Sequence, residues 1–111
     1  MKIDIKRVGT VEVLAPDGPL VDEDAEAFVD RLQIILQAPN PRFVIEMDKV
    51  PYLDSRGIEV LVDTADTLHK RGGQLRLASV TSTCREILEL TGQSRQVEFF
   101  DTAQDAVRSF L

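Results

Sequence analysis

Residues 43–58 read FVIEMDKVPYLDSRGI, and this stretch decides the fold. Its first five residues form a short, largely apolar segment, which is typical of a strand covered on both faces. After the loop that contains Pro51, apolar residues recur at helical spacing. These residues are Ile58, Leu61, Val62, Ala65 and Leu68. The stretch therefore predicts a buried strand that leads through a short loop into an amphipathic helix.

Two strands and a helix are predicted before this stretch. Residues 2–7 place two isoleucines on one face, and residues 11–15 form a second apolar run. The short link between them predicts an antiparallel hairpin, which the breaker at residues 16–19 (PDGP) ends. Asp22 is then expected to cap a helix whose first turn is acidic. The buried stripe of this helix is expected to contain Ala25, Phe28, Val29, Leu32, Ile35 and Leu36.

The rest of the chain alternates strand and helix. Residues 71–73 (RGG) end the second helix, and residues 75–78 form another buried strand. Residues 81–83 (TST) offer caps for a third helix, residues 97–100 form a last strand, and Thr102 caps a closing helix. The order β-β-α-β-α-β-α-β-α predicts an α/β fold with a mainly parallel mixed sheet and helices packed against it.

Size and charge narrow the possible functions. The chain has 111 residues, the size of one domain, so residues 1–111 are expected to form a single domain. Its net charge of −6 disfavours a nucleic acid or an anionic membrane as the main partner. No apolar run approaches the roughly 18 residues of a membrane span, so direct membrane insertion is not expected. With its single cysteine compatible with a reducing compartment, the sequence predicts a cytoplasmic protein.

The sequence offers no convincing catalytic or metal site. His69, the only histidine, falls at the basic end of a helix, where a solvated position is expected. Cys84 falls at the start of the third helix, on the side predicted to be buried. There is no glycine-rich phosphate loop and no cluster of His and Cys with metal-ligand spacing. We therefore expect a protein that is not an enzyme, with no catalytic residue, no metal and no cofactor.

Residues 52–58 (YLDSRGI) stand apart from this pattern. They connect the carboxyl end of a buried strand to a helix, the side that carries functional loops in open parallel sheets. Asp54 or Ser55 can cap the helix. Gly57 in the first turn costs up to about 1 kcal/mol relative to alanine and leaves the backbone open to close approach. Arg56 places a positive charge at the positive end of the helix dipole. Local stability explains neither residue, which favours a docking surface for another protein.

The chain resembles the sulfate transporter and anti-sigma factor antagonist (STAS) domains, in particular the stand-alone bacterial anti-sigma factor antagonists. The resemblance rests on an ordered set of segments that spans nearly the whole chain. They include residues 18–22 (GPLVD), 43–47 (FVIEM), 53–58 (LDSRGI), 73–77 (GQLRL) and 87–92 (ILELTG). The resemblance implies the STAS fold.

The resemblance also implies regulation of transcription by partner switching. In such systems the antagonist binds an anti-sigma factor, often a histidine-kinase-like serine kinase, and frees the sigma factor. The kinase phosphorylates a serine or threonine at the start of the second helix, and the added charge of about −1.5 to −2 breaks the complex. In this chain Arg56 stands at that position, and only the preceding hydroxyl, that of Ser55, remains.

Three interpretations of Arg56 are open. Phosphorylation has moved to Ser55, or the protein is an unswitched binder whose Arg56 pairs with an acidic partner. In the third, the protein is a STAS scaffold or a soluble subunit of a membrane transporter. The expected partner-binding residues are Asp54, Ser55, Arg56 and Gly57, with Asp22 from the loop before the first helix, and with Tyr52 and Leu53, of which at least one could belong to the core.

Overall fold

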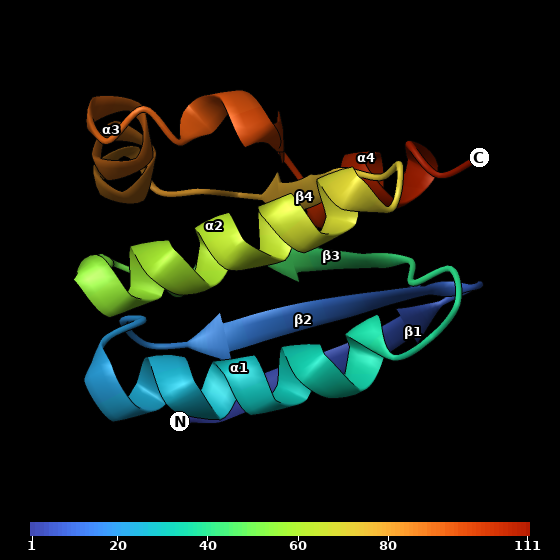
Figure 1. The fold of residues 1–111 in the computed structure, drawn as a ribbon, viewed down its shortest axis with the longest axis horizontal. Coiled ribbons are helices and arrows are strands. Elements are labelled where there is room, and N and C mark those ends of the chain that lie inside the picture. The colour runs from blue at the N-terminus through green and yellow to red at the C-terminus, as the bar shows by residue number, and fades with distance from the viewer.

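The computed structural model describes residues 1–111, except for the side chain of Ser94. The described residues form a five-stranded sheet in the order β1-β2-β3-β4-β5 (Figure 1). The strands are β1 (Lys2–Val8), β2 (Val11–Asp17), β3 (Phe43–Glu46), β4 (Leu75–Ala78) and β5 (Val97–Phe100). β1 pairs antiparallel with β2, and all other pairs are parallel. The predicted α/β class and the predicted order of strands and helices are confirmed.

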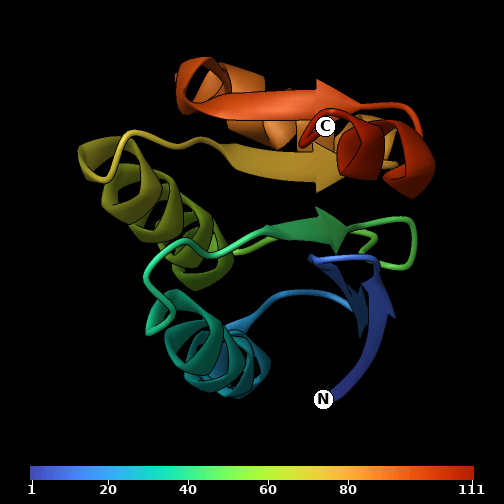
Figure 2. The same cartoon turned by 90° about the vertical axis from the view of Figure 1, so that its right-hand side faces the viewer.

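The helices cover both faces of this sheet. They are α1 (Asp22–Leu36), α2 (Ser55–Lys70), α3 (Ser82–Leu90) and α4 (Ala103–Arg108), with a 3₁₀ turn, η1 (Ser94–Gln96), that the sequence pattern did not predict. Because the parallel strands follow one another in sheet order, right-handed crossovers place α1, α2 and α3 on the same face. No strand follows α4, and this helix lies on the opposite face (Figure 2).

The apolar residues 43–45 contribute side chains to two hydrophobic cores, one on each face of the sheet. Phe43 and Ile45 point into the large core under α1, α2 and α3, whereas Val44 points into the smaller core under α4. All three residues are at most 3% exposed. This alternation explains why β3 carries no polar residue until Glu46, and it confirms the predicted strand covered on both faces.

Two local predictions need correction. The breaker expected at residues 16–19 begins too early, because Pro16 lies within β2 and pairs with Ile3. β2 pairs with β3 only as far as Leu14, so the part of β2 that contains Pro16 has β1 as its one neighbouring strand. A residue without an N–H is tolerated there. The buried face of α2 is also rotated from the predicted stripe. It consists of Gly57, Val60, Leu61, Thr64, Ala65 and Leu68, while Ile58 and Val62 are only partly buried.

Thr64 explains part of this rotation. Its hydroxyl donates a hydrogen bond of 2.7 Å to the Val60 carbonyl one turn earlier. The polar group is thereby satisfied within the helix, so the side chain can be buried at 5% exposure. A pattern of apolar residues alone does not predict that a threonine is buried at such a position.

Candidate protein-binding site

The side chain of Asp54 joins the N-termini of α1 and α2. Asp54 is the N-cap residue of α2, and its Oδ1 accepts a hydrogen bond of 2.9 Å from the Gly57 N–H. Its Oδ2 accepts a second bond of 3.0 Å from the Asp22 N–H, the first residue of α1. The prediction that Asp22 caps α1 is therefore wrong. The N-cap position belongs to Val21, which has no polar side chain, and Asp54 supplies the missing acceptor.

Main-chain contacts hold the two loops before these helices together. The Leu20 N–H donates to the Tyr52 carbonyl at 3.3 Å, and the Asp54 N–H donates to the Leu20 carbonyl at 3.3 Å. Leu20 and Leu53 form an isolated parallel bridge, and both side chains are buried in the core. The two loops thus continue the pairing of β2 and β3 past the carboxyl ends of the strands, which brings Asp54 beside Asp22.

Gly57 is required by this contact. A Cβ atom at residue 57 would lie 2.2 Å from the Leu20 carbonyl oxygen, far inside any real contact distance. The close approach expected at this glycine is therefore made by the protein's own backbone. Gly57 is buried, so it lets the two loops close and offers no side chain to a partner.

Arg56 is paired within the chain. Its Nε donates to Glu26 on α1, and its Nη1 donates to Glu59 on α2. The bond with Glu26 raises the pKa of Arg56, and the same bond holds the pKa of Glu26 below its ordinary value. Two carboxylates thus offset the unfavourable position of this cation at a helix N-terminus. Glu59 was visible in the sequence at three residues' distance, but Glu26 lies thirty residues away and was missed.

The far ends of α1 and α2 are also joined. Arg71, the C-cap residue of α2, donates to the carbonyls of Leu36, Ala38 and Pro39 at 2.8, 2.6 and 3.0 Å. α1 has no basic residue in its own last turn. The cap residues of α2 therefore bind both ends of α1, each through one main-chain group of that helix. The two parallel helices lie side by side (Figure 1).

The exposed part of the site is acidic, with one aromatic residue. Tyr52 is 49% exposed, whereas Leu53 is 6% exposed and belongs to the core. Ser55 is exposed, and its hydroxyl makes no hydrogen bond among the residues that the structure describes. Asp22 is exposed with a left-handed φ of +43°, a conformation that aspartate tolerates better than most residues. We call the surface formed by Asp22, Tyr52, Asp54 and Ser55 the α1–α2 corner.

Asp54 stays ionised at neutral pH. The hydrogen bond from the Gly57 N–H is the main cause that lowers the pKa of its carboxyl, with further bonds from Asp22 and Arg56. Desolvation opposes this shift but does not cancel it. Across the described part of the chain, no three His, Cys, Asp or Glu side chains gather in a way that could hold a metal ion. No helix in the same part is long and apolar enough to cross a bilayer.

Replacing Gly57 by alanine tests the contact with Leu20. Alanine normally stabilises a helix relative to glycine, by about 0.5–1 kcal/mol. At residue 57 we expect the opposite sign, a loss of about 1–3 kcal/mol of unfolding free energy in urea, because the backbone must move apart. Gly73→Ala is the control, since a Cβ there meets only an ordinary contact at 3.6 Å. A Gly57→Ala protein as stable as the wild type would contradict the described contact.

Substitutions of Asp54 test its double capping role. Asp54→Ala removes the acceptor of both N–H groups, whereas Asp54→Asn keeps one carbonyl oxygen and loses the charge. At neutral pH we expect the urea midpoint to fall in both variants, and to fall further with alanine. Equal midpoints for all three proteins would show that the carboxylate caps neither helix.

The acid limb of the stability curve gives a second measurement on the same variants. Because the pKa of Asp54 is lower in the folded than in the unfolded state, its contribution is present above the unfolded-state value of about 4 and is lost as pH falls through the folded-state value. We expect Asp54→Asn to lose less stability than the wild type over that fall in pH. An equal loss of stability in the wild type and in Asp54→Asn over that fall in pH would contradict this role of the carboxylate.

The family model of the STAS domain matches residues 2–106. A provisionally assigned anti-sigma factor antagonist of Thermotoga maritima is 25% identical, with a TM-score of 0.87 over 96% of this chain and 92% of its own. An anti-sigma factor antagonist of Mycobacterium paratuberculosis is 22% identical, with a TM-score of 0.85 over 97% and 92%. A sulfate transporter family protein of Wolinella succinogenes is 26% identical, with a TM-score of 0.70 over 94% and 88%. No curated protein sequence matches the chain. On the family match and this shared architecture, the chain belongs to the STAS domain family.

Proposed function

We propose that this protein is a cytoplasmic, non-catalytic, single-domain anti-sigma factor antagonist that regulates transcription by docking an anti-sigma factor on the α1–α2 corner. The observation that carries the proposal is the Asp54 carboxylate, which fixes the starts of α1 and α2 against each other. A rigid frame lowers the entropy lost on binding, so the exposed residues it carries are well placed for a specific interface.

The chemistry of the corner supports a protein partner. Tyr52 is a large, half-exposed side chain of the kind that dominates binding energy at interfaces. Beside it, Asp22, Glu23 and Asp24 give the start of α1 a local negative charge. We therefore expect the contact surface of the anti-sigma factor to combine an apolar pocket for Tyr52 with basic residues.

The pairing of Arg56 favours a binder that is not switched at this position. Arginine cannot accept a phosphate, and its guanidinium is already occupied by Glu26 and Glu59. This pairing also weakens the interpretation in which Arg56 serves an acidic partner, because such a partner must displace two carboxylates of the chain itself. In the alternative account, in which phosphorylation has moved, the phosphate acceptor is the Ser55 hydroxyl, which is exposed at the first position of α2.

A second candidate function is a STAS subunit of a membrane transporter. The likeness to the sulfate transporter family protein of Wolinella succinogenes favours it. Such a subunit would bind a permease rather than an anti-sigma factor, so the two functions differ in the partner and can be separated by one binding experiment.

Binding to the histidine-kinase-like regulators and the permeases of the source genome tests the proposal. We expect one regulator to bind, and we expect Tyr52→Ala and Ser55→Glu each to weaken that binding by about tenfold or more. Ser82→Glu is the matched control, because Ser82 is an exposed serine at the first position of α3. Wild-type binding by both corner variants would move the interface elsewhere, and binding of a permease alone would favour the second function.

Incubation of the complex with ATP tests the absence of a switch. We expect the affinity to stay unchanged and mass spectrometry to find no phosphate on the protein, since Arg56 replaces the usual acceptor. Ser55→Ala serves as the control for any phosphate that is found. Phosphate mapped to Ser55, together with release of the partner, would replace the unswitched account by a switched one.

A further inference from the structure

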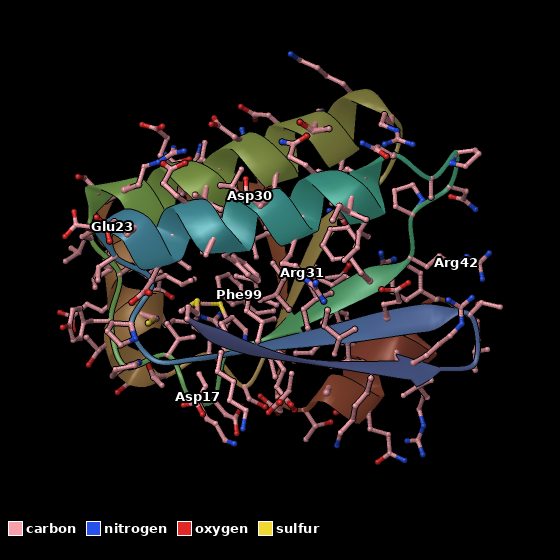
Figure 3. The ribbon with its side chains drawn as sticks, turned by 90° about the horizontal axis from the view of Figure 1, so that it is seen from below. Asp17, Glu23, Asp30, Arg31, Arg42 and Phe99 are labelled. Atoms are coloured by element: carbon pink, nitrogen blue, oxygen red, sulfur yellow. The ribbon has the colours of Figure 1, made fainter. Side chains whose placement is uncertain are left out.

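The fold gathers basic residues that are scattered in the sequence. The amino ends of β3 and β4 and the carboxyl ends of α2 and α4 meet at the edge of the sheet opposite the α1–α2 corner. Cations at this edge include Arg42, Lys70, Arg71, Arg76 and Arg108. Figure 3 shows Arg42 at one end of the molecule and Glu23 at the other. Positive charge is therefore concentrated at one end of the molecule, although the net charge of the chain is −6.

Two of these arginines line one cavity. The cavity measures about 200 Å³, and its walls include Arg42, Arg76, Asn40, Gln74, Gly73 and Phe110. Ile45 pairs with Leu77, and the same parallel register places Val44 beside Arg76. Arg42 precedes Val44 by two residues, so Arg42 and Arg76 are diagonal neighbours on the same face of adjacent strands. Like charges so placed repel each other.

The contacts of Arg76 leave donors free. Its Nε donates to Ser109 Oγ at 2.8 Å, and its guanidinium lies over the Phe110 ring, 3.8 Å from the centroid. Stacking occupies the face of the guanidinium, while its terminal N–H groups stay at the edge and donate no hydrogen bond among the described residues. Burial lowers the pKa of Arg76, with an opposing effect from Glu98 on β5.

Neither arginine of the pair forms an ion pair among the residues that the structure describes. Glu98 is the register partner of Arg76 on β5. Within the described part of the chain, however, neither Arg42 nor Arg76 has an acidic group within 4.0 Å, in contrast to Arg56 and Arg85. Arg42 makes one long hydrogen bond, of 3.4 Å to Thr10 Oγ1. Arg42 and Arg76 thus line one small cavity without an ion pair, an arrangement that an anion would stabilise.

We infer that Arg42 and Arg76 form a binding site for a phosphate-class oxyanion. The guanidinium fork matches the oxygens of phosphate or sulfate, and the side-chain amides of Asn40 and Gln74 can donate further hydrogen bonds. The cavity is smaller than the roughly 300–1,000 Å³ of pockets that enclose whole small molecules. The site therefore holds the charged group itself, either as a free ion or as the end of a phosphomonoester.

Titration of the ¹⁵N-labelled protein with inorganic phosphate tests the site by NMR. At constant ionic strength we expect saturable shifts of the Gly73, Gln74, Ser109 and Phe110 amides, with no such shifts from chloride. Phenyl phosphate gives the second arm. Tighter binding than phosphate would show that the group belongs to a phosphomonoester, and equal binding would favour the free ion.

Three variants make this test decisive. Arg42→Gln and Arg76→Gln should each weaken phosphate binding by about tenfold, the effect of losing a charge-assisted hydrogen bond. Arg31→Gln is the matched control on α1, across the sheet, and should bind as the wild type does. Linear, unsaturated shifts in the wild type, or unchanged affinity in both cavity variants, would overturn the inference. Binding of an oligoglutamate peptide without any binding of phosphate would overturn it in favour of an acidic protein partner.

Discussion

The carboxylate of Asp54 sets the geometry on which the rest of the α1–α2 corner depends. Each helix begins with N–H groups that have no partner inside the helix, and here one side chain serves both helices. That arrangement requires the loops before α1 and α2 to touch, which Leu20 achieves by placing its carbonyl against Gly57. Gly57 and Asp54 therefore act together: the absence of a Cβ at residue 57 permits the contact between the loops, and the Asp54 carboxylate stabilises it.

The same logic extends along both helices. Arg56, in the first turn of α2, is paired with Glu26 one turn into α1. At the far end Arg71 binds the carbonyl of Leu36, the last residue of α1, and two carbonyls of the loop that follows. Residues that looked unfavourable for α2 alone are therefore favourable for the pair. This pairing explains Arg56, at a position where the resemblance to the anti-sigma factor antagonists leads one to expect a hydroxyl. The position is used to fasten two helices together, and the surface beside it keeps a fixed shape.

The sequence predicts the elements well because their signals are local. The apolar run of residues 43–45, the helical spacing of α2 and the glycines that end helices act within a few neighbours. The loop between β3 and α2 was predicted for the same reason. Its chemistry was not, because the bonds that join Asp54, Arg56 and Arg71 to the α1 segment reach residues 30 to 35 positions away along the chain. Such pairings depend on the order of strands in the sheet, and the hydrophobic periodicity of the sequence does not predict them. The gathering of scattered arginines at the opposite edge has the same origin.

The two edges of the sheet give the molecule opposite characters, one acidic and fixed by Asp54, the other basic and open at Arg42 and Arg76. We propose that a protein partner docks on the acidic edge. Amide hydrogen exchange of the protein, free and bound to the proposed anti-sigma factor, tests that proposal most directly. The account predicts slower exchange on binding at residues 20–24 and 52–58, with no change at residues 70–76. Protection confined to α3, β1 or the basic edge would contradict it.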